Sequence, residues 1–416
     1  MNPLLTSEHL IPDVEAHVMP DGRLYLYGSH DDFQAEYCSH DYRVFSTNDP
    51  DLKCWVDHGE SFQNRDGEGQ VAWCRGTRLY APDAIHKNGK YYLYFCGANR
   101  CEGVAVADQP EGPFTDPTPI ALADGDAIDP AIFVDDDGSA YYFWGQYELR
   151  GARLNADMRS IDETTLKRRI LSEPEHGFHE GSSLRKRNGK YYLVYCDVSR
   201  GKATCLSYAV ADHPLGPYKK GGVIIDNTGA DPENWNNHGS IECFGGQWYV
   251  FYHRAVNKSI YMRRVCAEPI FFDENGMIGE VQMTCNGAEA PLDAFLPLPA
   301  SYACRVRGGV YVSVVPSDGG ASESLIGKGG HDLFLPWCEY KYLNFGEGAT
   351  ACRLTAKGDC TVRLFTEGGV LCGECQISSE DFSHYTFAVN NLAGTLPITL
   401  EFFGGRFELL DICFLK

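Results

Sequence analysis

The stretch DPAIFVDDDGSAYYFWG, residues 129–145, decides the fold because it contains a complete strand–turn–strand pattern. Its apolar run AIFV is followed by an acidic turn that ends at Gly138, and then by the aromatic run AYYFW. Two apolar runs around a glycine-containing turn predict a β-hairpin. The hairpin begins at a carboxylate, Asp129. An aspartate before proline often just starts a turn, so its meaning depends on whether the arrangement recurs.

The same hairpin occurs five times along the chain. Each copy has a glycine, a polar or small residue and an aromatic-rich run: GRLYLYG (22–28), GKYYLYF (89–95), GSAYYFW (138–144), GKYYLVY (189–195) and GQWYVFY (246–252). Successive copies start 67, 49, 51 and 57 residues apart, about the length of a four-stranded propeller blade with variable loops. No sustained helical stripe of apolar residues accompanies them. We therefore predict an all-β protein that begins with a five-bladed β-propeller.

A polar residue stands at a nearly constant distance before the glycine of each copy. Asp13, Asp129 and Glu180 lie nine residues before it, and His238 lies eight residues before it. Asp83 lies only six residues before its glycine, so its register differs. Because the innermost strands of a propeller line one central channel, the shared offset predicts that these side chains meet near the axis. Each acidic residue alone could equally cap a turn, but a shared offset favours a functional site.

Composition restricts the partners. The formal net charge of −21 disfavours nucleic acid and anionic membrane surfaces. The first residues have neither a basic segment nor a continuous apolar segment, and no run reaches membrane-spanning length. The seventeen cysteines are predicted to be reduced thiols in a cytoplasmic protein. Cys372 and Cys375 have CxxC spacing without a second metal-binding pair, which disfavours a zinc site.

At the offset residues the chain resembles glycoside hydrolase family 43, whose members are inverting enzymes on five-bladed propellers. DVEAHVMPDGRLYLYGSHD (13–31) is similar to the segment with the general base, which implies Asp13, although Val14 stands where the family usually has proline. IDPAIFVDDDGSAYYFWG (128–145) implies that Asp129 orients the acid and tunes its pKa. FHEGSSLRKRNGKYYLVY (178–195) implies Glu180 as the general acid, with Ser182 where proline is frequent.

The resemblance extends to about residue 290 and implies the substrate contacts. NNHGSIECFGGQWYVFYHR (236–254) implies that His238 lies under the substrate on the axis, where it can hold water or calcium. YMRRVCAEPIFFDENGMI (261–278) implies a substrate-binding arginine, Arg263. Asp83, within an APDAI segment, is predicted to contact the pocket. No cofactor is required by this resemblance, and structural calcium is an open expectation.

These assignments agree with the chemistry of glycoside cleavage. The reaction needs one protonated carboxyl group for the leaving oxygen and one carboxylate to activate water, roughly 6.5–9.5 Å apart for inversion. A third carboxylate near the acid keeps it protonated by like-charge repulsion. We expect an inverting, exo-acting glycosidase that releases α-L-arabinofuranosyl or β-D-xylosyl units from small plant-cell-wall oligosaccharides. The alternative is a sugar-binding propeller without turnover. The oligomeric state stays open.

A few residues near the predicted site remain ambiguous. Trp73, Trp144 and Trp235 could each present a flat face to a sugar, although packing between blades is the commoner use of a tryptophan. His253, which follows the fifth aromatic run, could lie near the site or at the rim.

The last third of the chain has a different pattern. We predict a propeller domain at 1–285, a linker at 286–300 that is rich in proline and alanine, and a β-sandwich domain at 301–416. WCEYKYLNFGEGATACRLTA and the ending GRFELLDICFL resemble family 6 carbohydrate-binding modules, which implies sugar contacts by Trp337 or Tyr340. A packing domain without a ligand is equally compatible with the pattern.

Overall fold

A computed structural model describes residues 1–65, 73–74, 76–122, 127–231, 235–331 and 335–416. Its regular structure is almost entirely β, with one short helix, α1 (Glu173–His176), and three 3₁₀ turns at 163–165, 300–302 and 367–369. In these described ranges, no helix has the length and apolar character needed to cross a membrane.

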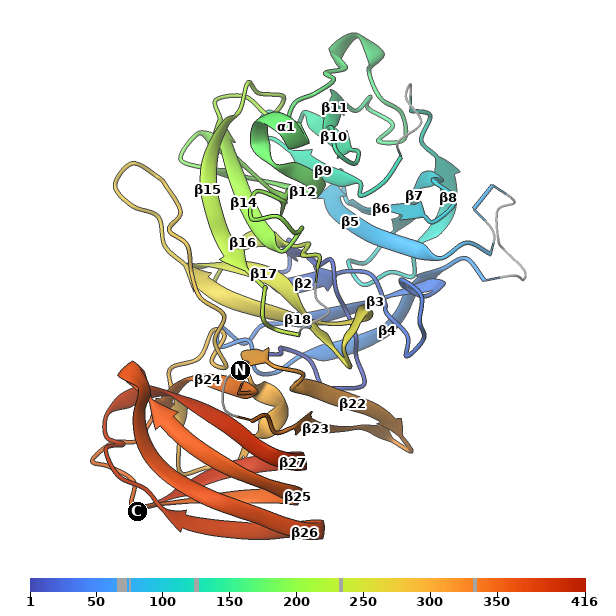
Figure 1. The fold of residues 1–416 in the computed structure, drawn as a ribbon. Coiled ribbons are helices and arrows are strands. Elements are labelled where there is room, and N and C mark those ends of the chain that lie inside the picture. The colour runs from blue at the N-terminus through green and yellow to red at the C-terminus, as the bar shows by residue number, and fades with distance from the viewer. Residues whose placement is uncertain (66–72, 75, 123–126, 232–234, 332–334) are drawn as a thin grey trace.

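Five separate antiparallel sheets form the blades of a β-propeller, as the repeated hairpin predicts (Figure 1). Blade 1 contains β1 (Glu15–Val18), β2 (Leu24–Tyr27), β3 (Asp41–Thr47) and β4 (Val56–Gln63); blade 2 contains β5 (Leu79–Lys87), β6 (Lys90–Gly97), β7 (Glu102–Ala107) and β8 (Thr115–Pro119); blade 3 contains β9 (Ala131–Val134), β10 (Ala140–Trp144) and β11 (Arg150–Arg153); blade 4 contains β12 (Phe178–Arg187), β13 (Lys190–Asp197), β14 (Cys205–Ala211) and β15 (Lys219–Asp226); blade 5 contains β16 (Ser240–Phe244), β17 (Gln247–Val256) and β18 (Ser259–Ile270).

The recurring hairpin is the inner pair of strands in every blade. The aromatic run forms the second strand, and the run before it forms the innermost strand. Blades 2 and 4 make this turn with Asn88-Gly89 and Asn188-Gly189, all four residues having positive φ angles between 50° and 76°. Asparagine and glycine tolerate that conformation, which suits a two-residue hairpin. The aromatic strands are buried between neighbouring blades because both of their faces meet another sheet.

The two ends of the propeller sequence close the ring. Val14, just before β1, forms a parallel bridge with Gly239, just before β16. The N-terminal segment also runs beside β18, where the backbone N–H of Leu4 donates to the carbonyl of Val265 at 3.0 Å. Residues of blade 1 and blade 5, more than 200 positions apart in sequence, are thereby held side by side.

The C-terminal part is a nine-stranded sheet connected by continuous hydrogen bonding. It contains β19 (Leu292–Asp293), β20 (Leu298–Pro299), β21 (Arg305–Arg307), β22 (Tyr311–Ser317), β23 (Gly320–Lys328), β24 (Trp337–Asn344), β25 (Ala351–Thr366), β26 (Val370–Ala388) and β27 (Thr395–Leu415). The long strands β25 and β27 pair through two register shifts, one between Thr355 and Ala356 and one between Gly358 and Cys360, where β-bulges allow a strand to bend.

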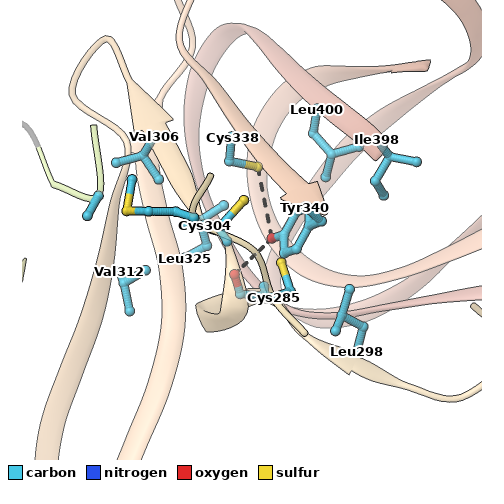
Figure 2. Packing of buried hydrophobic residues seen from close by; sticks show 14 of the residues in the cluster. Cys285, Leu298, Cys304, Val306, Val312, Leu325, Cys338, Tyr340, Ile398 and Leu400 are labelled. Atoms are coloured by element: carbon cyan, nitrogen blue, oxygen red, sulfur yellow. Dashed lines mark hydrogen bonds between the residues drawn. The ribbon is translucent and has the colours of Figure 1, made fainter. Parts of the chain in front are cut away.

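The segment 286–300, predicted as a linker, is packed into this C-terminal sheet. Its residues form β19, which pairs with β24, and β20, which pairs with β27. Leu298 is buried beside Tyr340, Ile398 and Leu400 (Figure 2). The proline and alanine content indicated a linker. Strands of two residues are too short to produce an alternation of apolar and polar residues, so the sequence did not reveal them. One hydrophobic cluster continues from blades 4 and 5 into this sheet, so the two parts pack firmly together.

Candidate active site

A pocket of about 170 Å³ opens at the end of the propeller channel where the inner strands begin. Five of the six predicted site residues line it, together with aromatic, thiol and amide side chains: Asp13, Asp129, Glu180, His238, Arg263, Tyr37, Cys38, Tyr80, Gln146, Trp235 and Asn236. These residues come from all five blades or their loops. The nearly constant sequence offset therefore does bring side chains from different blades to one place.

Local backbone geometry explains why an aspartate recurs at this position. Asp13 and Asp129 have positive φ angles of 56° and 55°, immediately before their inner strands. Aspartate tolerates this left-handed conformation better than most residues do. The chain thus turns sharply at each aspartate, and both side chains lie in the pocket at only 5% and 6% exposure.

Asp13 accepts hydrogen bonds from two directions. Ser29 Oγ donates to its Oδ2 at 2.7 Å, and Arg263 Nη1 donates to its Oδ1 at 2.9 Å. His253 Nδ1 lies 3.4 Å from the same Oδ1, which places this histidine at the site and not at the rim. Burial opposes ionisation, but the Arg263 guanidinium and the other groups around the carboxylate, including the Ser29 hydroxyl, together outweigh it and hold the pKa of Asp13 below its usual range. Asp13 is therefore ionised at neutral pH.

Asp129 has the opposite electrostatic environment. Burial, and then the carboxylates of Glu180 and Asp13, raise the pKa of Asp129 well above its usual range. Among the described residues, the only basic side chain within ion-pair distance of Asp129 is His238. Its Nδ1 lies 4.0 Å from both Asp129 Oδ2 and Asp13 Oδ1. Burial lowers the pKa of His238, so this ring is neutral. Asp129 therefore holds its proton more strongly than an ordinary aspartate does.

Glu180 lies on β12 of blade 4 and is half-buried. Gln146 Nε2 donates a hydrogen bond to Glu180 Oε2 at 2.8 Å, which fixes the orientation of the carboxyl group. The next residue, Gly181, lies against the His238 ring; a Cβ there would be 2.8 Å from the ring carbon Cδ2. Gly181 also has a φ of +65°. Only glycine therefore fits between the predicted acid and this histidine.

Arg263 on β18 is buried and makes more contacts than the sequence predicted. Its Nε and Nη2 bind the two carboxylate oxygens of Asp31 at 2.9 Å each, and its Nη1 binds Asp13. The guanidinium also lies 5.1 Å from the ring centre of Tyr37. These contacts use most of its donors, so Arg263 positions Asp13 and has little hydrogen-bonding capacity left for a ligand.

The structure does not place Asp83 in the pocket, which corrects the prediction that it contacts substrate. The residue nine positions before Gly89 is Tyr80, and Tyr80 lines the pocket. Asp83 lies three residues further along β5, past a β-bulge between Tyr80 and Asp83, and so deeper in the channel. There it contacts His17 Nε2 at 2.7 Å and accepts from the Ile132 N–H at 2.7 Å.

Several residues of the site were missed by the sequence reasoning. Asp31 and Ser29 belong to the segment GSHD (28–31), which follows the first aromatic strand, and that position was a usable signal. Gln146 follows the third aromatic strand at the equivalent place. Polar residues directly after the second strand of a blade therefore reach the site too: Gln146 lines the pocket, and Ser29 and Asp31 bind Asp13 and Arg263. Tyr37 and Cys38 lie on a loop without a recognisable pattern.

The aromatic residues predicted as candidate sugar contacts differ in their surroundings. Trp235 lines the pocket and is 36% exposed, whereas Trp144 is fully buried and Trp73 stacks on Phe95. In the C-terminal sheet, Tyr340 is fully buried and its hydroxyl donates to the carbonyl of Ala300 at 2.8 Å (Figure 2). Tyr340 therefore cannot contact a sugar. Trp337 is half-buried beneath the guanidinium of Arg305. A carbohydrate-binding role for this part stays a prediction.

The metal-ligating side chains do not fit the calcium expected at His238. Calcium takes six to eight oxygen ligands, whereas His238 offers a ring nitrogen, and the nearby Asp13 oxygens already bind Arg263 and Ser29. Across the described ranges, a single group of three such side chains has ligand atoms within 4.8 Å of one another, and it is Glu15, His17 and Asp83. Cys372 and Cys375 belong to no such group and are free thiols.

Comparisons with known proteins agree with this geometry. Residues 1–278 match the family Glycosyl hydrolases family 43. A xylosidase/arabinosidase 43A of Humicola insolens is 36% identical over 337 residues, which span 67% of this chain and 98% of that protein. A crystal structure of an arabinoxylan arabinofuranohydrolase from Bacillus subtilis, in complex with cellotetraose, has a TM-score of 0.58 at 25% identity and covers 100% of this chain and 97% of its own.

A second solved structure is similar over the propeller. It is a β-xylosidase/α-arabinofuranosidase from a compost microbial metagenome in complex with xylotriose, in a calcium-free form. Its TM-score is 0.57 at 31% identity, and the match covers 68% of this chain and 97% of that chain.

Proposed function

The chain belongs to glycosyl hydrolases family 43, and on this premise we propose that it releases single pentose units from small plant-cell-wall oligosaccharides with inversion of configuration. It is a glycosidase, so the question is which bond it cleaves and with which residues. We assign the general base to Asp13, the general acid to Glu180, and the tuning of that acid to Asp129.

The observation that carries this assignment is the contrast between neighbouring carboxyl groups in one pocket, since Arg263 and Ser29 bind Asp13 whereas Glu180 and Asp13 are the charged groups beside Asp129. Burial opposes ionisation of Asp13, but Arg263 and the other groups around the carboxylate, including Ser29, together lower its pKa; Asp13 can therefore accept a proton from water. Burial, and then the nearby Glu180 and Asp13, raise the pKa of Asp129, and we propose that Glu180, oriented by its hydrogen bond from Gln146, gives the proton to the leaving oxygen. His238 lies between Asp13 and Asp129. Because its ring is neutral, it adds no positive charge beside either carboxyl group.

The pocket supports a single terminal sugar as the unit that is cleaved off. Its volume of about 170 Å³ lies below the roughly 300–1,000 Å³ of pockets for drug-sized ligands. The similar proteins include a xylosidase/arabinosidase and a structure that holds xylotriose. We therefore propose α-L-arabinofuranosides and β-D-xylosides as the substrate class, with Trp235 at the mouth contacting the rest of the oligosaccharide.

Hydrolysis of 4-nitrophenyl α-L-arabinofuranoside, β-D-xyloside and β-D-galactopyranoside tests the substrate class. We expect turnover of one or both pentosides and little of the galactoside, whose extra hydroxymethyl group has no space. Proton NMR of the first-formed sugar tests the mechanism, because inversion gives the opposite anomer before mutarotation. A product with retained configuration would make one carboxylate a nucleophile and exclude the assigned roles.

We also propose that the enzyme works in a reducing compartment, as expected for a cytoplasmic protein. Most of its seventeen thiols are buried and all are free, which is supporting but indirect. Mass spectrometry of the protein purified from its native cells without reductant tests this; disulfide-linked peptides would contradict it.

A further inference from the structure

A second group of ionisable side chains lies in the channel below the pocket. On β1, Glu15 and His17 follow the predicted base Asp13 at steps of two residues, so they lie on the same side of the strand and progressively deeper. Asp83 of β5 meets them from blade 2. Their exposures are 2%, 6% and 1% for Glu15, His17 and Asp83. No step of the proposed hydrolysis uses this group.

The three side chains are close enough to share a ligand. His17 Nε2 lies 2.7 Å from Asp83 Oδ1 and 3.9 Å from Glu15 Oε2, and one ligating atom from each residue lies within 4.8 Å of the others. Around a tetrahedral ion with bonds of about 2.0–2.1 Å, ligand atoms stand roughly 3.4 Å apart. Rotamer adjustments of a few tenths of an ångström to about one ångström would therefore complete such a site.

Glu15 also has a buried oxygen with nothing to bind. Its Oε2 accepts from Ser183 Oγ at 2.8 Å and from Arg185 Nη2 at 3.3 Å, whereas its Oε1 is buried without a hydrogen-bond partner. A buried carboxylate oxygen is costly to leave unpaired. This oxygen belongs to a carboxylate that faces His17. Its lack of a partner indicates that the channel binds an additional group.

The charges around the cluster leave a negative excess. Three carboxylates face this part of the channel, namely Glu15, Asp83 and Glu242. The only guanidinium among them in the described structure is Arg185, which binds Glu242 at 2.9 Å and Glu15. With the carboxylates ionised and His17 neutral, as metal ligands must be, the group would carry a net charge of about −2. A divalent cation would neutralise it.

We propose that Glu15, His17 and Asp83 bind a divalent first-row transition-metal ion, with Mn²⁺ and Zn²⁺ the best-matched chemical types. A ring nitrogen with two carboxylate oxygens is a donor set for such ions, whereas calcium prefers oxygen ligands alone. The site is separate from the pocket, since Glu15, His17 and Asp83 line none of it. It would tie the inner strands of blades 1 and 2 together on the axis.

Manganese is the suitable probe because the seventeen thiols would compete for zinc. The full chain is treated with EDTA, exchanged into metal-free buffer and titrated with Mn²⁺, with free Mn²⁺ measured by electron paramagnetic resonance. We expect one ion per chain and a rise in the unfolding temperature. The variants His17→Gln and Asp83→Asn should each weaken binding at least tenfold, since each removes a ligand. Anomalous scattering from crystals soaked in Mn²⁺ should show the ion between these residues.

His238→Gln is the matched control, because it changes the histidine of the pocket and leaves the cluster intact. It should leave the affinity for Mn²⁺ unchanged. Loss of binding in His238→Gln with retention in His17→Gln would move the ion to the pocket and overturn the proposal. Absence of binding at millimolar Mn²⁺ would overturn it as well, and so would an anomalous difference map without a peak beside Glu15. If His17→Gln does not fold, Asp83→Asn, which keeps an acceptor for the Ile132 N–H, decides alone.

Discussion

Arg263 donates a hydrogen bond of 2.9 Å from Nη1 to Oδ1 of Asp13, across 250 positions of sequence. The arginine belongs to β18 of the last blade and the aspartate precedes β1 of the first, so this contact exists only when the propeller ring is closed. The charge state of the predicted base therefore depends on the completed fold. That dependence leads to a pair of variants for which we expect opposite shifts in the pKa of Asp13.

Neutralising Asp31 and removing the Ser29 hydroxyl should shift the pKa of Asp13 in opposite directions. Asp31→Asn removes a nearby negative charge and leaves the Arg263 guanidinium to Asp13, so the pKa of Asp13 falls further. Ser29→Ala removes a hydrogen bond to the charged form, so the pKa rises. The acidic limb of the pH profile of kcat/KM reports the base of the free enzyme. We expect it to move down in Asp31→Asn and up in Ser29→Ala, by roughly one pH unit each.

The alkaline limb provides the internal control for this pair. It reports the proton-donating group, which neither variant touches, so it should stay in place. Movement of the acidic limb in the same direction in both variants would mean that Asp13 is not the group being titrated.

Asp13→Asn tests the base itself. Asparagine keeps the size of the side chain and an oxygen that can accept from Arg263, and its amide N–H can donate to Ser29 Oγ, but it cannot take a proton from water. We expect kcat to fall by a factor on the order of 10²–10⁴, the usual contribution of general acid–base catalysis. Binding of xylose or arabinose, measured by calorimetry, should change little. Near-normal turnover would show that a different carboxylate activates the water.

Glu180→Ala tests the acid through the leaving group. Without a proton donor, substrates with poor leaving groups such as natural oligosaccharides should lose far more activity than 2,4-dinitrophenyl glycosides, which need no protonation. An equal loss on both substrates would assign the acid elsewhere.

Gln146→Leu tests whether the hydrogen bond to Glu180 positions this acid. Leucine removes the donor at 2.8 Å from Glu180 Oε2 with little change in volume. We expect the same leaving-group dependence as in Glu180→Ala but a smaller loss, about tenfold on natural substrates. A uniform loss on both substrate types, or a change in KM alone, would indicate a contact with the sugar instead of the acid.

The propeller and three site residues could be predicted because both depend on one short repeat. A fixed offset within a hairpin transfers directly into a fixed height on the inner strand, which places Asp13, Asp129 and Glu180 together. Asp83 failed for the same reason, since an offset shorter by three residues puts a side chain deeper in the channel. Applied strictly, the rule selects Tyr80, which does line the pocket.

The remaining site features depend on contacts between distant blades and could not be read from a local pattern. The pairing of Arg263 with Asp31 spans 232 positions, and the packing of Gly181 on His238 joins blades 4 and 5. In the C-terminal part, an aromatic residue in a strand pattern is equally compatible with a core position and a binding surface. Tyr340 is a core residue because its hydroxyl finds the Ala300 carbonyl inside the cluster.

Asp129→Asn should exchange activity for stability. Burial first, and then Glu180 and Asp13, raise the pKa of Asp129 above that of the unfolded chain. A group with a raised folded-state pKa contributes stability that is fully present below its unfolded pKa and is lost as pH rises toward the folded value. Asparagine has no proton to lose and still accepts from a backbone N–H. We therefore expect the variant to unfold at a higher temperature than the wild type at pH 7.5, with the difference shrinking toward pH 5.

Glu102→Gln provides the comparison that separates the electrostatic effect from the catalytic one. Burial raises the pKa of Glu102 to about 8, and Tyr142 donates to its Oε2 at 2.6 Å while its Oε1 is buried without a partner. It does not line the pocket. Glu102→Gln should also stabilise the protein, increasingly as pH rises from the unfolded-state pKa of glutamate towards 8, because glutamine has no proton to lose, and its activity should stay near that of the wild type. Asp129→Asn should combine a similar stabilisation with a loss of kcat, because it removes the carboxyl group assigned to tune the acid. Thermal unfolding across pH 5–8.5, measured alongside kcat for both variants, checks the two effects together. A destabilised Asp129→Asn would mean that the ionised carboxylate is stabilised by its surroundings and that its pKa is not raised.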